Sequence, residues 1–301
     1  MIPIRNLILE GVDASGKSTL YRNIHRATDF RNNIIDRSTL SALCYSRLYG
    51  RDTSFTADSH LNEVCDANNF FVVLLPPLDV VLQRLRVRGD EYQDEASLTR
   101  LHGIFESEVA RIEDLPNVCV IREPIGPAGL TEEVTRRLSL YSSKSPNELG
   151  AHLIPWTALT SFDEVQLRVS FVLAPGRRDP SILNHPHEGQ YYRSILSQCR
   201  DVIEREASGI NPYGVPQDST SRRFYYNSDT CISSIHFLPR GDTLRVMATL
   251  RSTDAAANGS PDLQFLEFLA GEVQSDSGWG TSRIVLDVRF NSLHFRRDRV
   301  L

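Results

Sequence analysis

Short apolar runs alternate with amphipathic stretches along roughly the first 140 residues. The apolar runs predict strands at Asn6–Glu10, Asn33–Asp36, Phe70–Leu75 and Val118–Ile121. The stretches between them predict helices that include Leu78–Arg88 and Ala96–Ile112. The run at Phe70–Leu75 is apolar at every position, which is typical of a strand buried on both faces. Strands separated by helices imply an α/β fold with a parallel sheet covered on both sides.

The pattern changes after this region. The segment Tyr141–Gly150 is polar and contains Pro and Gly, which is typical of a linker. Beyond it the sequence predicts strands at Val165–Ala174, His236–Leu238, Thr243–Arg251 and Ile284–Phe295, and a helix at Asp262–Val273. This mixture predicts an α+β domain. We therefore divide the chain into a first domain at residues 1–142, a linker at 143–160 and a second domain at 161–301.

The composition describes a globular protein and argues against several functional classes. Apolar residues make up 41% and charged residues 24% of the 301 positions, which is enough to build sizeable cores. Lys and Arg number 33 against 38 Asp and Glu, a net charge of −5, which argues against nucleic acid as a partner. The five cysteines have no CxxC spacing, so we expect reduced thiols without a disulfide framework or zinc. We expect no signal peptide, no membrane span and a location in the cytoplasm, of a cell or of a virus-infected host.

One motif carries clear chemistry. Residues Gly11 to Ser18 match the pattern G-x-x-x-x-G-K-[ST], directly after a predicted strand and before a predicted helix. The loop amides and the helix start suit a phosphate, Lys17 suits the β- and γ-oxygens of ATP, and the Ser18 hydroxyl suits Mg²⁺. The expected ATP contacts are Gly11, Asp13, Ala14, Ser15, Gly16, Lys17, Ser18 and Thr19. A chance match in a strand-turn-helix is the alternative.

The first domain resembles thymidylate kinases, in the compact form of phage-type nucleotide kinases. Three segments carry the resemblance: Leu9–Thr19 around the loop, Asp36-Arg37-Ser38 after the second strand, and Leu82–Asp90 as a lid helix. The resemblance implies that Asp36 and Arg37 lie near the acceptor phosphate and that Arg84 and Arg88 neutralise transition-state charge. The alternatives are a structural ion pair at the strand end and a solvated helix face.

The second domain resembles the thymidylate synthase and deoxycytidylate hydroxymethylase family. The segment Ser221-Arg222-Arg223 precedes Cys231, and Arg251-Ser252-Thr253-Asp254 follows it at the family's spacing. The resemblance implies that Arg222, Arg223, Arg251 and Ser252 bind a nucleotide phosphate, with Arg222 and Arg223 reaching across a homodimer. Near these cations we expect a depressed pKa for Cys231, which would be the nucleophile that adds to C6 of a pyrimidine.

Two further positions refine this resemblance. Asp262 stands where the family reads the base, and a carboxyl group there suits cytosine; the alternative is a first-turn acid of a helix. His294 resembles the family's ribose contact. Ile232 and Leu250 depart from the family pattern, and neither the catalytic Glu segment nor the C-terminal segment that closes over folate has a counterpart. A nucleotide site can therefore be present without the methylenetetrahydrofolate chemistry.

These observations lead to a hypothesis and two rivals. The hypothesis is a bifunctional pyrimidine-nucleotide enzyme: an ATP- and Mg²⁺-dependent nucleoside monophosphate kinase fused to a dCMP or dUMP hydroxymethylase. The first rival keeps the kinase and makes the second domain a non-catalytic module that binds nucleotide and dimerises. The second rival is a kinase that acts on nucleic acid, against which the acidic net charge counts.

Overall fold

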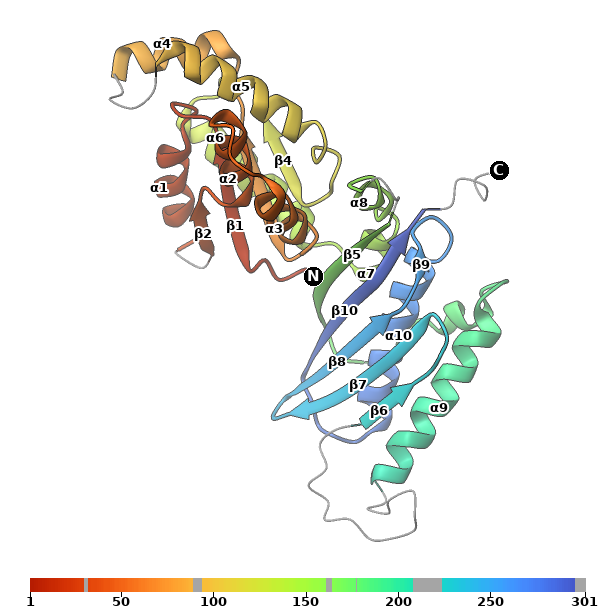
Figure 1. Cartoon of the computed structure of the whole chain (residues 1–301). Helices are drawn as coiled ribbons and strands as arrows, with labels where there is room; N and C mark the ends of the chain where they lie inside the picture. The colour runs from red at the N-terminus through yellow and green to blue at the C-terminus, as the bar shows by residue number, and fades with distance from the viewer. Residues whose placement is uncertain (30–31, 89–93, 161–163, 177, 208–223, 296–301) are drawn as a thin grey trace. The chain divides into compact units, whose positions relative to one another are not determined.

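The computed structural model describes residues 1–29, 32–88, 94–160, 164–176, 178–207 and 224–295. The chain forms two compact units, drawn in Figure 1. The first unit is Ile4–Ser143, and the second combines Met1–Pro3 with Lys144–Leu301. The N-terminal residues belong to the second unit because the amide of Val172 donates to the carbonyl of Met1 at 2.8 Å.

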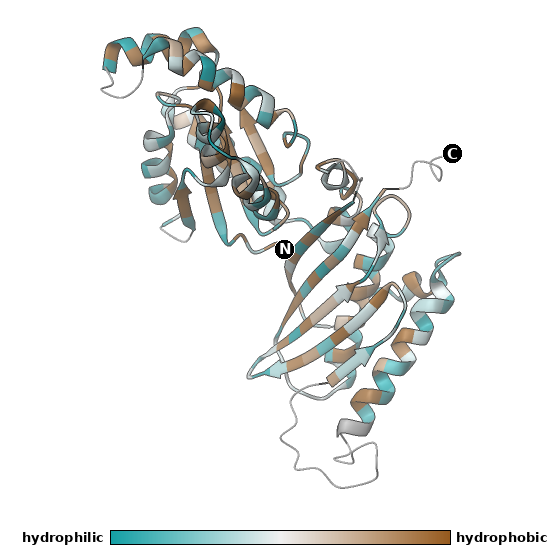
Figure 2. Ribbon diagram, in the orientation of Figure 1, coloured by the Kyte–Doolittle hydropathy of each residue, from teal (hydrophilic) through white to brown (hydrophobic). Residues whose placement is uncertain are grey.

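The first unit is built on a parallel four-stranded sheet with the order β2-β1-β3-β4. The strands are β1 (Asn6–Gly11), β2 (Asn33–Asp36), β3 (Asn69–Leu74) and β4 (Val118–Ile121). Every position of β3 is buried, as expected for a strand covered on both faces. In Figure 2 the strands of this unit are largely brown, because their residues are apolar. The predicted α/β class of the first half is confirmed.

Two groups of helices cover this sheet. Helices α1 and α6 pack against each other, and α2, α3 and α5 form the second group on the other face (Figure 1). The helices are α1 (Lys17–Ala27), α2 (Thr39–Leu48), α3 (Ser54–Val64), α4 (Leu78–Arg88), α5 (Glu95–Val109) and α6 (Pro127–Ser142). The helix predicted at Ala96–Ile112 begins one residue earlier because Asp94 caps it, accepting from the amide of Ser97 at 2.7 Å.

The segment predicted as a linker is ordered and contains two short helices, α7 (Pro146–Gly150) and α8 (Ile154–Thr157). Ser145 and Glu148 form a capping box that starts α7. Gly150 lies so close to the next layer that a Cβ there would come within 2.5 Å of Ser260 Cα. From Lys144 onward this segment therefore belongs to the second unit and carries helical structure of its own.

The second unit is a mixed sheet with the order β5-β10-β8-β7-β6, and the short strand β9 pairs with β10. Strand β10 runs antiparallel to β5 and parallel to β8. The strands are β5 (Glu164–Leu173), β6 (Phe224–Asn227), β7 (Ile232–Arg240), β8 (Thr243–Leu250), β9 (Thr253–Asp254) and β10 (Arg283–His294). The predicted α+β class of the second half is confirmed.

Helices lie against one face of this sheet (Figure 1). They are α9 (Gly189–Ala207) and α10 (Gly259–Asp276), with a short 3₁₀ helix at Pro180–Asn184. The predicted helix at Asp262–Val273 lies inside α10, whereas α9 was not predicted. Among the residues that the structure describes, no helix combines the length and apolarity that a bilayer crossing needs.

Candidate active site

The loop from Gly11 to Ser18 joins β1 to α1 and has the backbone of an anion cradle. Gly11 has φ of 133°, and a Cβ there would lie 2.1 Å from the carbonyl oxygen of Leu74. Gly16 caps α1 with φ of 109°, and Ala14 also adopts a positive φ of 59°. Glycine is required at position 11 both by the conformation and by the close approach of β3.

Lys17 lies over this loop. Its side chain is only 6% exposed, and Nζ donates to the carbonyls of Gly11 and Val12 at 2.7 Å each. Burial and, to a smaller extent, the nearby Arg37 together lower the pKa of Lys17 to about 8, against the attraction of the surrounding carboxylates. The ammonium group is thus bound by the loop that it would leave in order to reach a phosphate.

A cavity of about 360 Å³ opens beside the loop. Its lining brings together the loop and the predicted residues of other elements: Asp13, Ala14, Ser15, Gly16, Lys17, Ser18, Thr19, Asp36, Arg37, Arg84 and Arg88. Arg84 reaches across from α4, and its Nη1 donates to the carbonyl of Ser15 at 3.1 Å. Arg86, between the two arginines of the lining, instead forms a two-point pair with Glu95 outside the cavity. The helix therefore presents alternate arginines to the cavity.

An aromatic residue that the sequence did not single out binds two of the residues that line the cavity. The Tyr45 hydroxyl donates to Asp13 Oδ2 at 2.6 Å and accepts from Arg37 Nη1 at 2.7 Å. Arg37 also forms an ion pair with Asp13. Burial and the bond to Asp13 raise the pKa of Tyr45 to about 12. The three side chains form a closed polar triangle at the end of β2.

Glu10, at the end of β1, is fully buried behind the loop. Its Oε1 accepts from the amides of Ser38 and Ser41 at 2.8 and 3.2 Å, and its Oε2 accepts from the Ser41 hydroxyl. Burial raises the pKa of Glu10, although these hydrogen bonds oppose the shift. Glu10 thus fixes the start of α2, the helix that carries Tyr45, relative to the phosphate loop.

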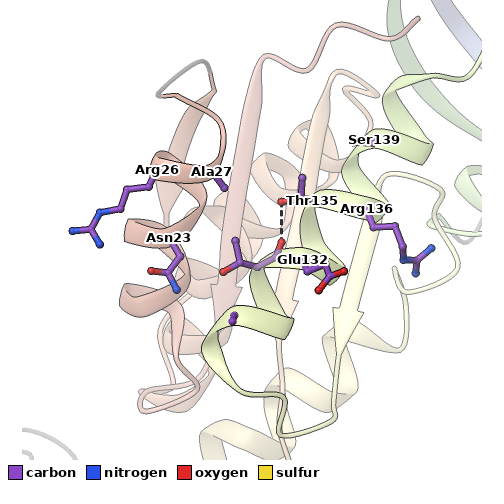
Figure 3. A pocket seen from close by; sticks show the side chains of 9 residues that line it. Asn23, Arg26, Ala27, Glu132, Thr135, Arg136 and Ser139 are labelled. Carbon is purple, nitrogen blue, oxygen red and sulfur yellow. Dashed lines mark hydrogen bonds between the residues drawn. The ribbon is translucent and has the colours of Figure 1, made fainter.

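A second hollow of about 760 Å³ lies between α1 and α6 (Figure 3). It is larger than the cavity beside the loop, but some of its polar groups are engaged with neighbouring residues. The hydroxyl of Thr135 donates to the carbonyl of Thr131 at 2.8 Å, and Arg136 forms a two-point pair with Glu133. No lysine lines it and its carboxylate and guanidinium groups do not converge in Figure 3, so we place the active site at the loop.

In the second unit, Cys231 stands half-buried before β7. Its carbonyl accepts from the amide of Arg251 at 2.7 Å, which brings the segment after β8 beside it. Burial raises the pKa of Cys231; Asp262 and Glu188 raise it further, and Arg251 opposes them. The predicted depressed pKa was therefore wrong for the described residues. Arg222 and Arg223 lie outside the described residues.

Asp262 is deeply buried, at 2% exposed, in the first turn of α10. Its Oδ1 accepts from the Tyr192 hydroxyl at 2.9 Å, and its Oδ2 accepts from the Thr253 hydroxyl at 3.2 Å. Burial raises the pKa of Asp262 to about 7. Tyr192 in turn stacks on Phe265, with ring centres 4.4 Å apart. Both oxygens of the predicted base reader are thus engaged by the protein.

The remaining predicted residues of this site meet where β9 pairs with β10. His294 is in register with Asp254, and its Nδ1 lies 3.4 Å from the Ser252 hydroxyl. Asp254 is buried; its Oδ1 accepts from the amide of Ala256 at 3.0 Å. Its Oδ2 has no hydrogen-bond partner among the described residues. An N–H donor of a ligand would satisfy that oxygen.

Glu188 is a candidate functional residue that the sequence analysis missed. It lies in the turn before α9, and its amide donates to His185 Nδ1 at 3.2 Å. Its carboxylate raises the pKa of both Cys231 and Asp262, which places its charge close to them. The signal available in the sequence was the start of the unrecognised helix α9, because that helix directs Glu188 and Tyr192 to this site.

No family model matches the sequence, and no curated protein matches it. Among solved structures, the YorR protein of Bacillus subtilis, in complex with phosphorylated GDP, is 19% identical; the match covers 45% of this chain and 96% of that one, with a TM-score of 0.36. Deoxyadenosine kinase from M. mycoides, with dCMP and dCDP, is 12% identical over 45% and 98%, with a TM-score of 0.36. Thymidylate synthase from T4 phage is 14% identical over 33% and 35%, with a TM-score of 0.22. These likenesses are too distant to transfer an activity.

Proposed function

We propose that the first unit is a kinase that moves the terminal phosphoryl group of ATP to a pyrimidine nucleoside monophosphate. The observation that supports it is the convergence of the loop, Lys17, Arg37 and Arg84 on one cavity beside the carboxyl ends of parallel strands. Two separate sets of cations, one on the loop side and one near the strand end, suit two phosphate groups that must meet.

The residues fit ATP and magnesium. The loop amides and the N-terminus of α1 would hold the β-phosphate, and the exposed Ser18 hydroxyl would hold Mg²⁺. Bound Mg-ATP would supply the phosphoryl group and part of the charge neutralisation. Lys17, with a pKa of about 8, stays largely protonated at pH 7 and would exchange the Gly11 and Val12 carbonyls for phosphate oxygens.

Each remaining group of the cavity has a distinct task in this proposal. Arg37 would bind the phosphate of the acceptor, and Asp36 would orient the acceptor or take its proton. Arg84 and Arg88 would stabilise the negative charge on the transferred phosphoryl group. Such electrostatic stabilisation is larger where water is excluded. In this role Arg84 would exchange the loop carbonyls that it binds for phosphate oxygens.

Phosphate transfer from labelled ATP to all monophosphates, including 5-hydroxymethyl forms, tests the proposal. Arg84→Ala should lower kcat by about a hundredfold or more, as expected for a group that stabilises transition-state charge. Arg86→Ala is the matched control on the same helix, because its exposed pair with Glu95 lies outside the cavity; its kcat should stay within about twofold. Transfer only to oligonucleotides would instead select a kinase of nucleic acid, and no transfer to either would reject the kinase.

For the second unit we propose a pyrimidine nucleotide site that hydroxymethylates C5 of dCMP or dUMP. The support is that Cys231 and Asp262 lie within electrostatic reach of one carboxylate, Glu188, which could act as the general base. Asp254 would bind the nucleotide or folate through Oδ2, and His294, which pairs with it at the end of β10, would contribute a second contact. Methylenetetrahydrofolate would supply the carbon, and the product would be an acceptor for the kinase.

The raised pKa of Cys231 favours a second candidate, a unit that binds nucleotide without catalysis, since the thiolate is the nucleophile. Tritium release from C5-labelled dCMP or dUMP, with and without methylenetetrahydrofolate, separates the two. Release that disappears in Cys231→Ser supports the hydroxymethylase. Nucleotide binding without any release supports the binding module. Light scattering at several concentrations tests the proposed homodimer.

A further inference from the structure

Tyr45, on α2, joins two charged residues at the rim of the phosphate-loop cavity. Its hydroxyl accepts a hydrogen bond from Arg37 Nη1 at 2.7 Å and donates one to Asp13 Oδ2 at 2.6 Å. Arg37 Nη2 pairs with the other oxygen of the same carboxylate, Asp13 Oδ1. The guanidinium carbon also lies 5.3 Å from the centre of the Tyr45 ring. The hydroxyl therefore uses both its donor and an acceptor position to fix the two charges.

The backbone of Arg37 also constrains the orientation of its side chain. Its φ is 64°, in the left-handed region that a residue with a Cβ rarely adopts. Its amide donates to the carbonyl of Leu9 at 2.9 Å, which ties it to the end of β1. Strained residues of this kind persist where the surroundings over-determine them, and they cluster at ligand sites. The direction of Arg37 is thus set by β1 at one end and by Tyr45 and Asp13 at the other.

The hydroxyl also stands between Arg37 Nη1 and Asp13 Oδ2. Arg37 and Asp13 alone would favour a two-point ion pair, in which the guanidinium uses two parallel N–H groups on both carboxylate oxygens. Tyr45 occupies Oδ2, so Arg37 has one of these oxygens and keeps three of its five N–H groups outside the triangle. A guanidinium held in this way can bind a second anion without breaking its first contacts.

We propose that Tyr45 is a positioning residue for the phosphate of the acceptor: its hydroxyl keeps Arg37 from closing onto Asp13 and turns the guanidinium toward the cavity. This inference rests on the proposed kinase function, because it takes Arg37 to be the ligand of the acceptor phosphate. The phenol stays protonated at neutral pH, since burial raises the pKa of Tyr45 to about 12. Its effect on the acceptor should therefore be the same from pH 6 to pH 9.

Tyr45→Phe tests the proposal, because it keeps the ring beside Arg37 and removes only the hydroxyl. The KM of the monophosphate acceptor should rise about tenfold, the usual effect of losing one hydrogen bond to a charged group. The kcat and the KM of ATP should stay within about twofold, a split that a general loss of packing would not produce. Tyr49→Phe is the matched control: Tyr49 is the residue that follows the end of α2, and its ring centre lies 6.3 Å from that of Tyr45.

A second variant tests the same three side chains through a different member. Asp13→Asn removes the charge but keeps the shape, and it should also raise the acceptor KM. The double variant Asp13→Asn, Tyr45→Phe should raise it by less than the product of the single effects, because without the Asp13 charge Arg37 has no carboxylate to close onto when the hydroxyl is removed. If the wild type transfers phosphate and Tyr45→Phe has the same acceptor KM, the inference about Tyr45 is overturned and the proposed function stands. A wild type without phosphate transfer overturns the proposed function, and this inference with it.

Discussion

Replacing Lys17 should stabilise the first unit while abolishing the proposed phosphate transfer. The Lys17 ammonium is 6% exposed, and burial lowers its pKa from 10.5 to about 8. Below pH 8 Lys17 is charged in both states, but the charged form is less stable in the folded protein than in the unfolded chain. Lys17→Met removes that charge from the interior and keeps a side chain of similar length. A site built for phosphate is expected to carry such a cost when it is empty.

The magnitude follows from the pKa. The fall in the pKa of Lys17 from 10.5 to about 8 means that the charged side chain lowers the free energy of unfolding by about 3 kcal/mol at pH 7. Two carbonyls, those of Gly11 and Val12, lose a donor in the variant, which offsets about 1 kcal/mol each. At pH 7 the first unit of Lys17→Met should therefore be about 1 kcal/mol more stable than the wild type.

The sign reverses at higher pH. Between pH 8 and pH 10.5 the folded wild type loses the proton before the unfolded chain does, so its stability rises with pH. From pH 7 to pH 9.5 the wild type should gain about 2 kcal/mol that the variant does not. The stability curves of the two proteins should then cross, and Lys17→Met should be about 1 kcal/mol less stable at pH 9.5.

The assay must report on the first unit alone. The two tryptophans, Trp156 and Trp279, both lie in the second unit, so their fluorescence does not follow the loop. Pulse proteolysis in urea, with fragments assigned by mass spectrometry, measures the folded fraction of each unit separately. A difference between variant and wild type that stays constant from pH 7 to pH 9.5 would refute the buried charge as its cause.

Three further outcomes are expected. Gly11→Ala should abolish ATP binding and destabilise the first unit by about 3 kcal/mol or more in the same assay, because its Cβ would lie 2.1 Å from a backbone oxygen; normal ATP binding would contradict this. Asp262→Asn should flatten the stability of the second unit between pH 4 and pH 7, followed by tryptophan fluorescence. The wild type should lose about 3 kcal/mol over that range, because the raised pKa of about 7 keeps a proton on the folded state that the unfolded chain largely loses; equal slopes would contradict it. Alkylation of Cys231 by iodoacetamide should be slow at pH 7.5 and accelerate above pH 9, since burial raises the pKa of its thiol. A rate that levels off below pH 8 would show a depressed pKa after all.

The candidate site of the first unit could be predicted closely because most of its residues belong to a local backbone motif. The eight residues from Gly11 to Ser18 must be contiguous for the loop to form, so the sequence displays the whole cradle. Arg84 and Arg88 could also be predicted from the sequence, because the spacing of four residues places them on one face of a helix. The contacts of Tyr45 could not be predicted from the sequence. They depend on the positive φ of Arg37 and on the hydrogen bonds by which Glu10 holds the start of α2 beside the loop.

Helix α9 in the second half was missed despite a readable signal. Its buried apolar residues recur at helical spacing: Tyr192, Ile195, Leu196, Cys199 and Ile203. Polar side chains between them conceal the pattern in a strand-rich region. Missing α9 also meant missing Glu188, which directly precedes it, and thus one of the two carboxylates that act on Cys231.

The error at Cys231 has a physical cause that bears on the function of the second unit. The expected thiolate rested on arginines near Cys231 in the sequence, but the pKa responds to what surrounds the sulfur in space. Burial, Asp262 and Glu188 all oppose the thiolate, and Arg251 is the described cation that favours it. A bound nucleotide phosphate would add a further negative charge. Nucleophilic catalysis by Cys231 therefore requires additional positive charge, which Arg222 and Arg223 could bring from this chain or from a second copy. If alanine at both positions left tritium release unchanged, the chemistry of this unit would not proceed through Cys231.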